Sequence, residues 1–410
     1  MKRRVLLASL GVGVTALSGC VSDADLEYAR DFVYANAGEV TCDGETSSPL
    51  DESEIEAVDG TWVQSGYDSR NTGYAADEQG PDGCPQVQWH ASPTPPLDGM
   101  NNIRQPLVAD GRVYSNSHSK LFAFSATTGE LEWEVDHGSL VRSSAYDDGT
   151  LYVAGYELAA FDAESGEEQW RTGVPNQRIR DSITFAEGQL YLPLRDRRLL
   201  SMTTDGDQRW SAYIEEAERS PTDTSLGNVT KPAVADGVVY AGCVDDGVSA
   251  FDAATGEDRW HRPEMDVGAG PVVDDQYVYV RGRDLRALDR ADGSTVWTAL
   301  EDEGRAHRPV LADGTLYVLV GHEVSDPGLV AIDAESGAER WRRELDRYRQ
   351  SPVAADGLVY VPDDERLRAF DADDGSEVWR LQTSTNTLEL ATIAGGVVFL
   401  MTDKRVYALA

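Results

Sequence analysis

The sequence predicts an all-β protein folded as an eight-bladed β-propeller, and three observations lead to this prediction. A turn of the Ala-x-Asp-x-x-Thr-Gly type runs into a tryptophan seven times, at Trp133, Trp170, Trp210, Trp260, Trp297, Trp341 and Trp379. Neighbouring copies lie 37 to 50 residues apart, which is the length of one four-stranded blade. Between the tryptophans a second signature recurs, so the chain is built from repeats of one unit.

The second signature is a tight turn followed by a β-rich run. Its clear copies are ADGRVY at 109–114, DDGTLY at 147–152, AEGQLY at 186–191, ADGVVY at 235–240, ADGTLY at 312–317 and ADGLVY at 355–360. Two degenerate copies, DDQYVYV at 274–280 and AGGVVFL at 394–400, bring the count to eight. Asp-Gly supplies the left-handed backbone of a hairpin turn, and Val, Leu and Tyr suit half-buried strands. Each unit is therefore predicted to hold four strands, with tryptophan on the last.

The last copy is incomplete, because the chain ends at Ala410 before any Thr-Gly turn or tryptophan. Trp89 stands 44 residues ahead of Trp133 and has no Asp-Gly half of its own upstream. We therefore expect the strand around Trp89 to complete the blade begun at about residue 390. Pairing of N- and C-terminal strands would close the ring and remove exposed sheet edges.

The repeats resemble those of the PQQ-like, or quinoprotein-type, β-propeller family. Ala250, Asp252, Thr255, Gly256 and Trp260 match its docking motif A-x-D-x-x-T-G-x-x-x-W, and the resemblance extends over about residues 60–410. The stretch TWVQSGYDSRNTGY at 61–74 also resembles the first strand and loop of the family. The resemblance implies the fold and leaves the function open, because one fold hosts many functions.

The recurrence of one tryptophan per blade indicates structural docking between blades rather than an aromatic ligand cage. Each ring can bury about 150–250 Å² against the neighbouring blade. The docking set consists of Trp89, Trp133, Trp170, Trp210, Trp260, Trp297, Trp341 and Trp379.

Residues 1–19 are interpreted as a signal peptide, because a basic start is followed by an apolar stretch too short to span a bilayer. The run Leu17-Ser18-Gly19-Cys20 resembles a lipobox, so Cys20 is the predicted lipidated N-terminus. Arg3-Arg4 resembles a twin-arginine export signal, and an ordinary secretory signal is the alternative. Both predict an exported protein held by its lipid on the outer face of the cytoplasmic membrane.

The formal net charge is −36, and after residue 19 the only lysines are Lys120, Lys231 and Lys404. Such a surface resembles proteins of extreme halophiles, in which salt screens the self-repulsion. It argues against a nucleic-acid partner and against electrostatic adhesion to anionic lipid. Residues 20–60 are predicted to form an acidic tether, and residues 61–410 the single propeller domain.

Cysteine usage fits an exported protein. Cys42 and Cys84 flank the first strand region and could form a disulfide that fixes the tether to the ring. Cys243 then stays single and is interpreted as a small buried apolar residue.

No metal site is predicted. The six histidines occur singly, without the spacing of zinc ligands. Asp371, Asp373, Asp374 and Gly375 are similar to part of a calcium loop, but sister repeats carry FDAATGE or FDAESGE in the same place. We interpret these residues as the repeat turn.

Cations precede the Asp-Gly signature in several repeats, where the innermost strand of a blade should start near one mouth of the central channel. Converging on one axis, they could form a positively charged funnel that attracts an anion, such as a carboxylate-bearing ligand or an acidic partner segment. The alternative is that they neutralise neighbouring carboxylates. The candidate anion funnel consists of Arg104, Arg142, Arg180, Lys231, Arg308 and Arg349, with Arg178 and His307 beside it.

Three functions are compatible with these features. The first is a non-catalytic, lipid-anchored propeller that serves as a platform for other envelope or membrane proteins, similar in layout to the bacterial propeller lipoprotein of outer-membrane assembly. The second is a PQQ- and calcium-dependent dehydrogenase of alcohols or sugars, although no Cys-Cys pair and no haem-attaching C-x-x-C-H motif are present. The third is a binder of a small anion or sugar. No cofactor is expected under the first interpretation.

Overall fold

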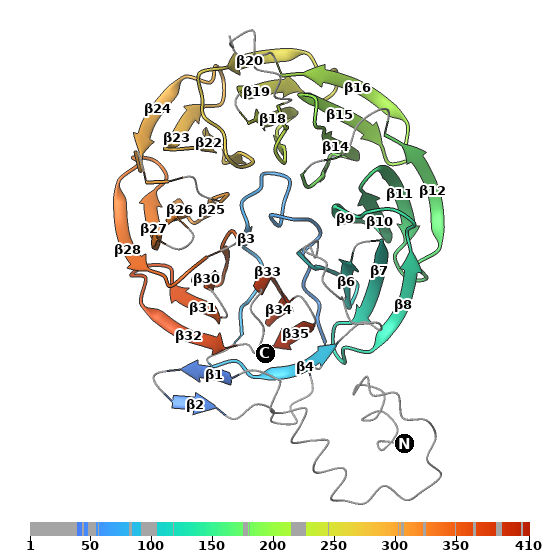
Figure 1. Cartoon of the computed structure of the whole chain (residues 1–410), viewed down its shortest axis with the longest axis vertical. Helices are drawn as coiled ribbons and strands as arrows, with labels where there is room; N and C mark the ends of the chain where they lie inside the picture. The colour runs from blue at the N-terminus through green and yellow to red at the C-terminus, as the bar shows by residue number, and fades with distance from the viewer. Residues whose placement is uncertain are drawn as a thin grey trace, which may run out of the picture.

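The protein forms a ring of eight β-sheets around a central axis, as the repeats predict (Figure 1). The computed structural model describes residues 39–42, 45–47, 55, 57–81, 84–91, 105–117, 119–174, 179, 181–214, 227–244, 246–301, 303–304, 307–322, 325–348, 350–363, 366–382, 388–402 and 405–410. Within these ranges all regular structure is strand, and each blade is an antiparallel sheet whose first strand lies innermost (Figure 1).

Blades 1 to 4 each follow the chain from the axis outward. Blade 1 contains β5 (Leu107–Ala109), β6 (Arg112–Ser117), β7 (Lys120–Ser125) and β8 (Leu131–Asp136). Blade 2 contains β9 (Ser143–Asp147), β10 (Thr150–Ala154), β11 (Glu157–Asp162) and β12 (Glu168–Gly173). Blade 3 contains β13 (Thr184–Ala186), β14 (Gln189–Pro193), β15 (Arg198–Thr203) and β16 (Gln208–Tyr213). Blade 4 contains β17 (Ala233–Ala235), β18 (Val238–Cys243), β19 (Gly247–Asp252) and β20 (Asp258–Arg262).

Blades 5 to 8 complete the ring. Blade 5 contains β21 (Val272–Val273), β22 (Tyr277–Arg281), β23 (Leu285–Asp289) and β24 (Thr295–Ala299). Blade 6 contains β25 (Val310–Ala312), β26 (Thr315–His322), β27 (Ser325–Asp333) and β28 (Glu339–Glu344). Blade 7 contains β29 (Val353–Ala355), β30 (Leu358–Asp363), β31 (Arg366–Asp371) and β32 (Glu377–Gln382). Blade 8 contains β33 (Leu388–Ala394), β34 (Val397–Thr402), β35 (Val406–Leu409) and β4 (Val87–Ala91).

The Asp-Gly turns join the first two strands of most blades. Asp236 and Gly237 have φ angles of 50° and 72°, so both central residues occupy the left-handed region that a tight hairpin requires. The degenerate copy in blade 5 uses another device, because the Asp274 carboxylate accepts hydrogen bonds from the backbone N–H groups of Gln276 and Tyr277 at 2.7 and 2.6 Å. An Asx turn thus replaces the Asp-Gly turn in that blade.

The docking tryptophans lie between blades. Trp260 on β20 donates its indole N–H to the Arg290 carbonyl of the next blade at 2.9 Å. Its ring covers Gly293, where an added Cβ would lie 2.7 Å from the ring. The same indole-to-carbonyl bond is made by Trp89, Trp133, Trp210, Trp297 and Trp341. Packing of ring on glycine therefore holds successive sheets together.

The ring closes as predicted, since β4 near the N-terminus is the outer strand of blade 8. It pairs antiparallel with β35, with Trp89 opposite Ala408 and His90 opposite Tyr407. The two ends of the propeller domain thus share one sheet, in which β4 covers the edge of β35 by backbone pairing.

Part of the predicted tether is structured, which the sequence pattern did not indicate. Strands β1 (Glu39–Cys42) and β2 (Glu45–Ser47) form a hairpin, and β1 pairs antiparallel with the outer strand β32 of blade 7 (Figure 1). The hairpin extends that sheet outward and covers its edge by backbone hydrogen bonds.

Candidate functional site

A channel segment, residues 61–75, crosses the centre of the ring beside the inner strands (Figure 1). Inner strands of six blades donate backbone hydrogen bonds of 2.7–3.0 Å to its carbonyls: Val108 to Trp62, Tyr146 to Val63, Val234 to Ser69, Val273 to Arg70, Leu311 to Thr72 and Ala354 to Gly73. Its last strand, β3 (Tyr74–Ala75), pairs parallel with β29. Because every contact lies two residues before an Asp-Gly or equivalent turn, the segment occupies that end of the channel.

Asn71 fixes the segment against two blades. Its side chain is fully buried and donates from Nδ2 to the carbonyls of Pro232 and Pro271, both at 3.0 Å. Its φ angle is 61°, a left-handed conformation that asparagine tolerates better than most residues. The remaining amide oxygen accepts a hydrogen bond from Lys231 Nζ.

Lys231 precedes β17 and extends toward the axis with only 2% of its surface exposed. Burial, together with the nearby charge of Arg308, lowers the pKa of Lys231 from 10.5 to about 7, while Asp68 and Asp181 act in the opposite direction. The backbone N–H of Lys231 donates to Asp181 Oδ2 at 3.0 Å. Strongly lowered lysine pKa values of this kind cluster at functional sites.

Arg308 approaches the same place from blade 6, immediately before β25. It is 9% exposed, and its guanidinium lies on Gly66, where an added Cβ would be 3.0 Å from Cζ. Burial lowers the pKa of Arg308, against the favourable charges of Asp181 and Asp68. Within the part of the chain that the structure describes, its buried Nε has no hydrogen-bond partner.

Asp68 is the half-buried carboxylate that the channel segment contributes to the cluster. Its oxygens accept hydrogen bonds from the backbone N–H and the hydroxyl of Thr72, both at 2.9 Å. Burial raises the pKa of Asp68, while the Thr72 bonds and the charges of Lys231 and Arg70 lower it. Asp68 therefore interacts with the channel cations through space, and its hydrogen bonds go to its own turn.

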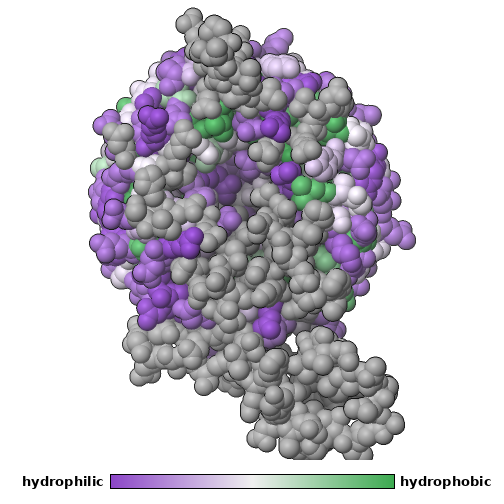
Figure 2. All heavy atoms as spheres, in the orientation of Figure 1, coloured by the Kyte–Doolittle hydropathy of each residue, from purple (hydrophilic) through white to green (hydrophobic). Residues whose placement is uncertain are grey.

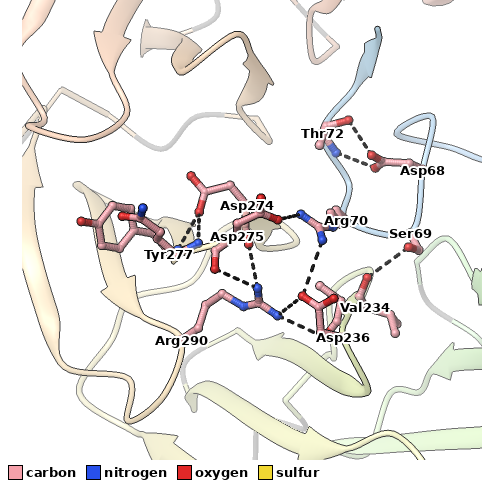
Figure 3. A network of polar contacts seen from close by, with 12 residues as sticks. Asp68, Ser69, Arg70, Thr72, Val234, Asp236, Asp274, Asp275, Tyr277 and Arg290 are labelled. Atoms are coloured by element: carbon pink, nitrogen blue, oxygen red, sulfur yellow. Dashed lines mark hydrogen bonds and ion pairs between the residues drawn. The ribbon is translucent and has the colours of Figure 1, made fainter. Parts of the chain in front are cut away.

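At the Asp-Gly end, Arg70 links the channel segment to blades 4 and 5. It forms ion pairs with Asp275 at 2.5 Å and with Asp236 at 3.5 Å (Figure 3). Arg290 pairs with the same Asp236 at 2.9 Å. Asp236 and Asp275 are 65% and 85% exposed, so water screens these pairs strongly.

Neighbouring residues of the segment are therefore expected to differ in their contribution to stability. Arg70→Ala should lower the free energy of unfolding by less than about 1 kcal/mol, because its ion pairs are exposed. Asn71→Ala should cost about 2–4 kcal/mol, because it leaves buried carbonyls and the Lys231 ammonium unpaired. Denaturant unfolding of both variants checks this, and equal losses would contradict the assignment of Asn71 as the residue that fixes the segment.

The structure places three of the six funnel cations among the described residues. Lys231 and Arg308 come together at the axis, whereas Arg142 is half-buried and donates its backbone N–H to Ala154. Arg104, Arg180 and Arg349 lie outside the described residues, as does Arg178. The carboxylates Asp68 and Asp181 accompany the two central cations, so the cluster holds both signs of charge.

The cysteines are described in part. Cys84 is disulfide-bonded, and Cys243 is a buried thiol on β18 that donates to Asp246 Oδ2 at 3.4 Å. Cys42 lies on β1, but its side chain is outside the described part, so its pairing with Cys84 stays a prediction. Cys20 also lies outside the described residues.

The described residues contain no group of three or more His, Cys, Asp or Glu side chains that could hold a metal ion. Nor is any helix in these ranges long and apolar enough to cross a membrane.

Sequence reasoning missed the residues that the channel segment contributes, chiefly Asp68, Asn71 and Gly66. They stand in the stretch whose resemblance to a family first strand and loop was its only signal. Asn71 meets Lys231, and Gly66 meets Arg308, more than 100 residues away along the chain, so no local pattern connects them.

Eight blades of PQQ-like repeats, closed by the terminal strands and crossed by the chain's own N-terminal segment, define a PQQ-type β-propeller. Residues 82–299 and 281–410 match the family described as Outer membrane protein assembly factor BamB. Because the match covers well over half of the sequence, the chain belongs to this family.

Its relatives include enzymes and assembly factors. The tetrathionate hydrolase of Acidithiobacillus ferrooxidans is 24% identical over 337 residues, which cover 67% of this chain and 64% of that protein. The polyvinylalcohol dehydrogenase of a Sphingopyxis species is 24% identical over 263 residues, 60% of this chain and 34% of that protein. The outer membrane protein assembly factor BamB of Yersinia pestis is 23% identical over 274 residues, 59% of this chain and 67% of that protein. The chain spans less than two thirds of the length of the first two.

Solved structures show the same fold. The quinohemoprotein alcohol dehydrogenase of Pseudomonas putida superposes with a TM-score of 0.69 at 14% identity, covering 86% of this chain and 80% of that one. BamB of Moraxella catarrhalis superposes with a TM-score of 0.62 at 16% identity, covering 79% of this chain and 99% of that one.

Proposed function

We propose that the protein is a non-catalytic platform for other envelope or membrane proteins, exported and anchored through lipid on Cys20 to the outer face of the cytoplasmic membrane. Membership of the BamB family supports a platform.

One structural observation carries the proposal, namely that the chain's own residues 61–75 occupy the Asp-Gly end of the channel. The protein's own chain thus fills that end of the central channel. Surfaces left to a partner include the outer strands, which expose apolar side chains at Leu131, Tyr213 and Val296 with 43%, 57% and 46% of their surface accessible. They lie on blades 1, 3 and 5, so they give three separate positions on the outer rim at which contact with a partner can be probed.

The alternative is a PQQ- and calcium-dependent dehydrogenase, which the dehydrogenase relatives keep under consideration. The described channel residues do not fit a calcium-bound quinone. Both Asp68 oxygens already accept hydrogen bonds from Thr72, and Lys231 and Arg308 place positive charge beside them, which would repel the cation. No redox step is therefore assigned to this channel.

Calorimetric titration of the purified full chain with PQQ, with and without calcium, separates the two functions. The platform predicts no saturable heat in molar KCl. Saturable one-site binding that requires calcium would overturn the proposal and direct the work to alcohol substrates.

Site-specific photo-crosslinking on intact cells tests the platform directly. Probes at Leu131, Tyr213 and Val296 are compared with probes in the Asp-Gly turns at Asp148 and Asp313. We expect adducts of defined mass at a subset of positions, and Cys20→Ser, which lacks the proposed lipid attachment site, should release the protein from the cells and lose the adducts. Uniform weak labelling at every position would contradict a defined docking surface.

A further inference from the structure

We propose that Arg308 and Lys231 form a binding site for a small carboxylate ligand, such as acetate or formate, inside the central channel. This inference is independent of the platform function, because it concerns the axis of the ring rather than its outer surface. The centre of the ring is hollowed and hydrophilic in the space-filling view (Figure 2).

The guanidinium of Arg308 is unpaired among the described residues. In a chain of net charge −36, arginines at the surface readily pair with carboxylates, as Arg342 does with Glu303 and Arg366 with Asp346. Arg308 is more than nine-tenths buried, yet among the described residues it makes no ion pair or hydrogen bond, and its Nε is orphaned. Leaving a buried charged donor unpaired is costly, so a partner from outside the chain is favoured.

The nearby carboxylates of Asp68 and Asp181 already accept hydrogen bonds from other donors. Asp68 accepts both of its hydrogen bonds from Thr72. Asp181 accepts from the backbone N–H groups of Lys231 and Ser182, at 3.0 and 2.7 Å. Their negative charges stabilise the two cations at a distance. Among the described residues, neither carboxylate accepts a hydrogen bond from the Lys231 ammonium or the Arg308 guanidinium.

The head groups of Arg308 and Lys231 are both hydrogen-bond donors that suit a carboxylate. A guanidinium presents parallel N–H donors that match the two oxygens of a carboxylate, and the Lys231 ammonium uses one donor on Asn71 and has others remaining. The exposed fractions of 9% and 2% leave access only for a small ligand. The Gly66 backbone beneath the guanidinium has no Cβ to fill the approach.

The test is a titration of the full chain with potassium acetate, in which acetate replaces potassium fluoride at constant ionic strength. Binding is followed by calorimetry and by the rise in melting temperature that a native-state ligand causes. We expect one saturable site. Arg308→Gln should weaken acetate binding by at least about tenfold, and Arg308→Lys, which keeps the charge but loses the planar fork, by about fivefold.

The matched control is Arg283→Gln, which removes one arginine that is 74% exposed and 3.7 Å from Asp266. Its acetate affinity should stay within about twofold of wild type, since surface charges are screened. Formate serves as the smaller probe and should bind to the same site. Absence of saturable acetate binding, or equal affinity in wild type, Arg308→Gln and Arg308→Lys, would overturn the proposal.

Discussion

Replacing Trp260 with alanine is expected to lower the free energy of unfolding by about 3–5 kcal/mol, because a buried indole between two blades is lost. Trp260 is 8% exposed, packs against Tyr240 within its own blade and donates to the Arg290 carbonyl of the next. Denaturant unfolding followed by tryptophan fluorescence and circular dichroism gives the measurement. A loss of less than about 1 kcal/mol would contradict a docking role.

A glycine pair supplies the control for this docking contact. Gly293 and Gly314 have φ angles of 72° and 70°, so alanine at either position pays the left-handed strain of about 1–2 kcal/mol. Only at Gly293 would the new Cβ meet Trp260, at 2.7 Å, whereas nothing lies within 4 Å of the Cβ position at Gly314. Gly293→Ala should therefore cost more than Gly314→Ala.

The difference should disappear in the Trp260→Ala background, where the ring is absent. The double variant Trp260→Ala/Gly293→Ala is expected to lose less stability than the sum of the single variants, by about 1–3 kcal/mol. Strict additivity would show that ring and glycine do not act as one docking contact.

The architecture could be predicted because one sequence unit recurs from blade to blade. Each blade needs a left-handed turn, apolar strands and a docking tryptophan, so one unit is recognisable at Asp236, Gly237 and Trp260 and again in its sisters. Even the closure followed from counting, because a missing outer strand at the C-terminus and a surplus one around Trp89 have one solution.

The β1–β2 hairpin could not be predicted, because it depends on backbone pairing with β32 and lies in a strongly acidic stretch of sequence. Net charge and low hydrophobicity favour a solvated chain when the sequence is considered alone. The edge of blade 7 supplies the hydrogen-bond partners that a local pattern does not contain.

Only the two cations of the candidate site could be predicted from the sequence. Lys231 and Arg308 were identifiable because both precede an inner strand, a position that the repeat fixes relative to the axis. Asp68 and Asn71 belong to a segment that occurs once, and their positions depend on contacts with several blades. Whether the cations stand alone or beside carboxylates is thus decided by non-repeating sequence.

The stability difference between wild type and Lys231→Met is expected to change by about 3–5 kcal/mol between pH 7 and pH 10, in favour of wild type. Burial lowers the pKa of Lys231 from its ordinary 10.5 to about 7 in the folded protein. Between these two values the unfolded chain binds one more proton than the folded chain, so wild-type stability rises with pH. Below about pH 7 both states carry the proton, and the cost of the buried charge is present in full.

Denaturant unfolding of wild type and Lys231→Met at intervals of pH gives this difference and cancels the titrations that the two proteins share. Lys120→Met is the matched control for the loss of one lysine, because Lys120 lies at the surface beside Glu134. A constant gap between wild type and Lys231→Met from pH 7 to pH 10 would show that Lys231 is not buried as a lysine of lowered pKa.

The proposed carboxylate ligand makes the same titration diagnostic. Acetate bound beside Lys231 favours the protonated ammonium, so the pKa of Lys231 rises when the site is filled. The pH range over which wild type gains on Lys231→Met should then move upward in saturating acetate, and it should stay in place in fluoride of equal ionic strength. An unmoved range with acetate demonstrably bound would place the ligand away from Lys231, because two charges in contact cannot titrate independently.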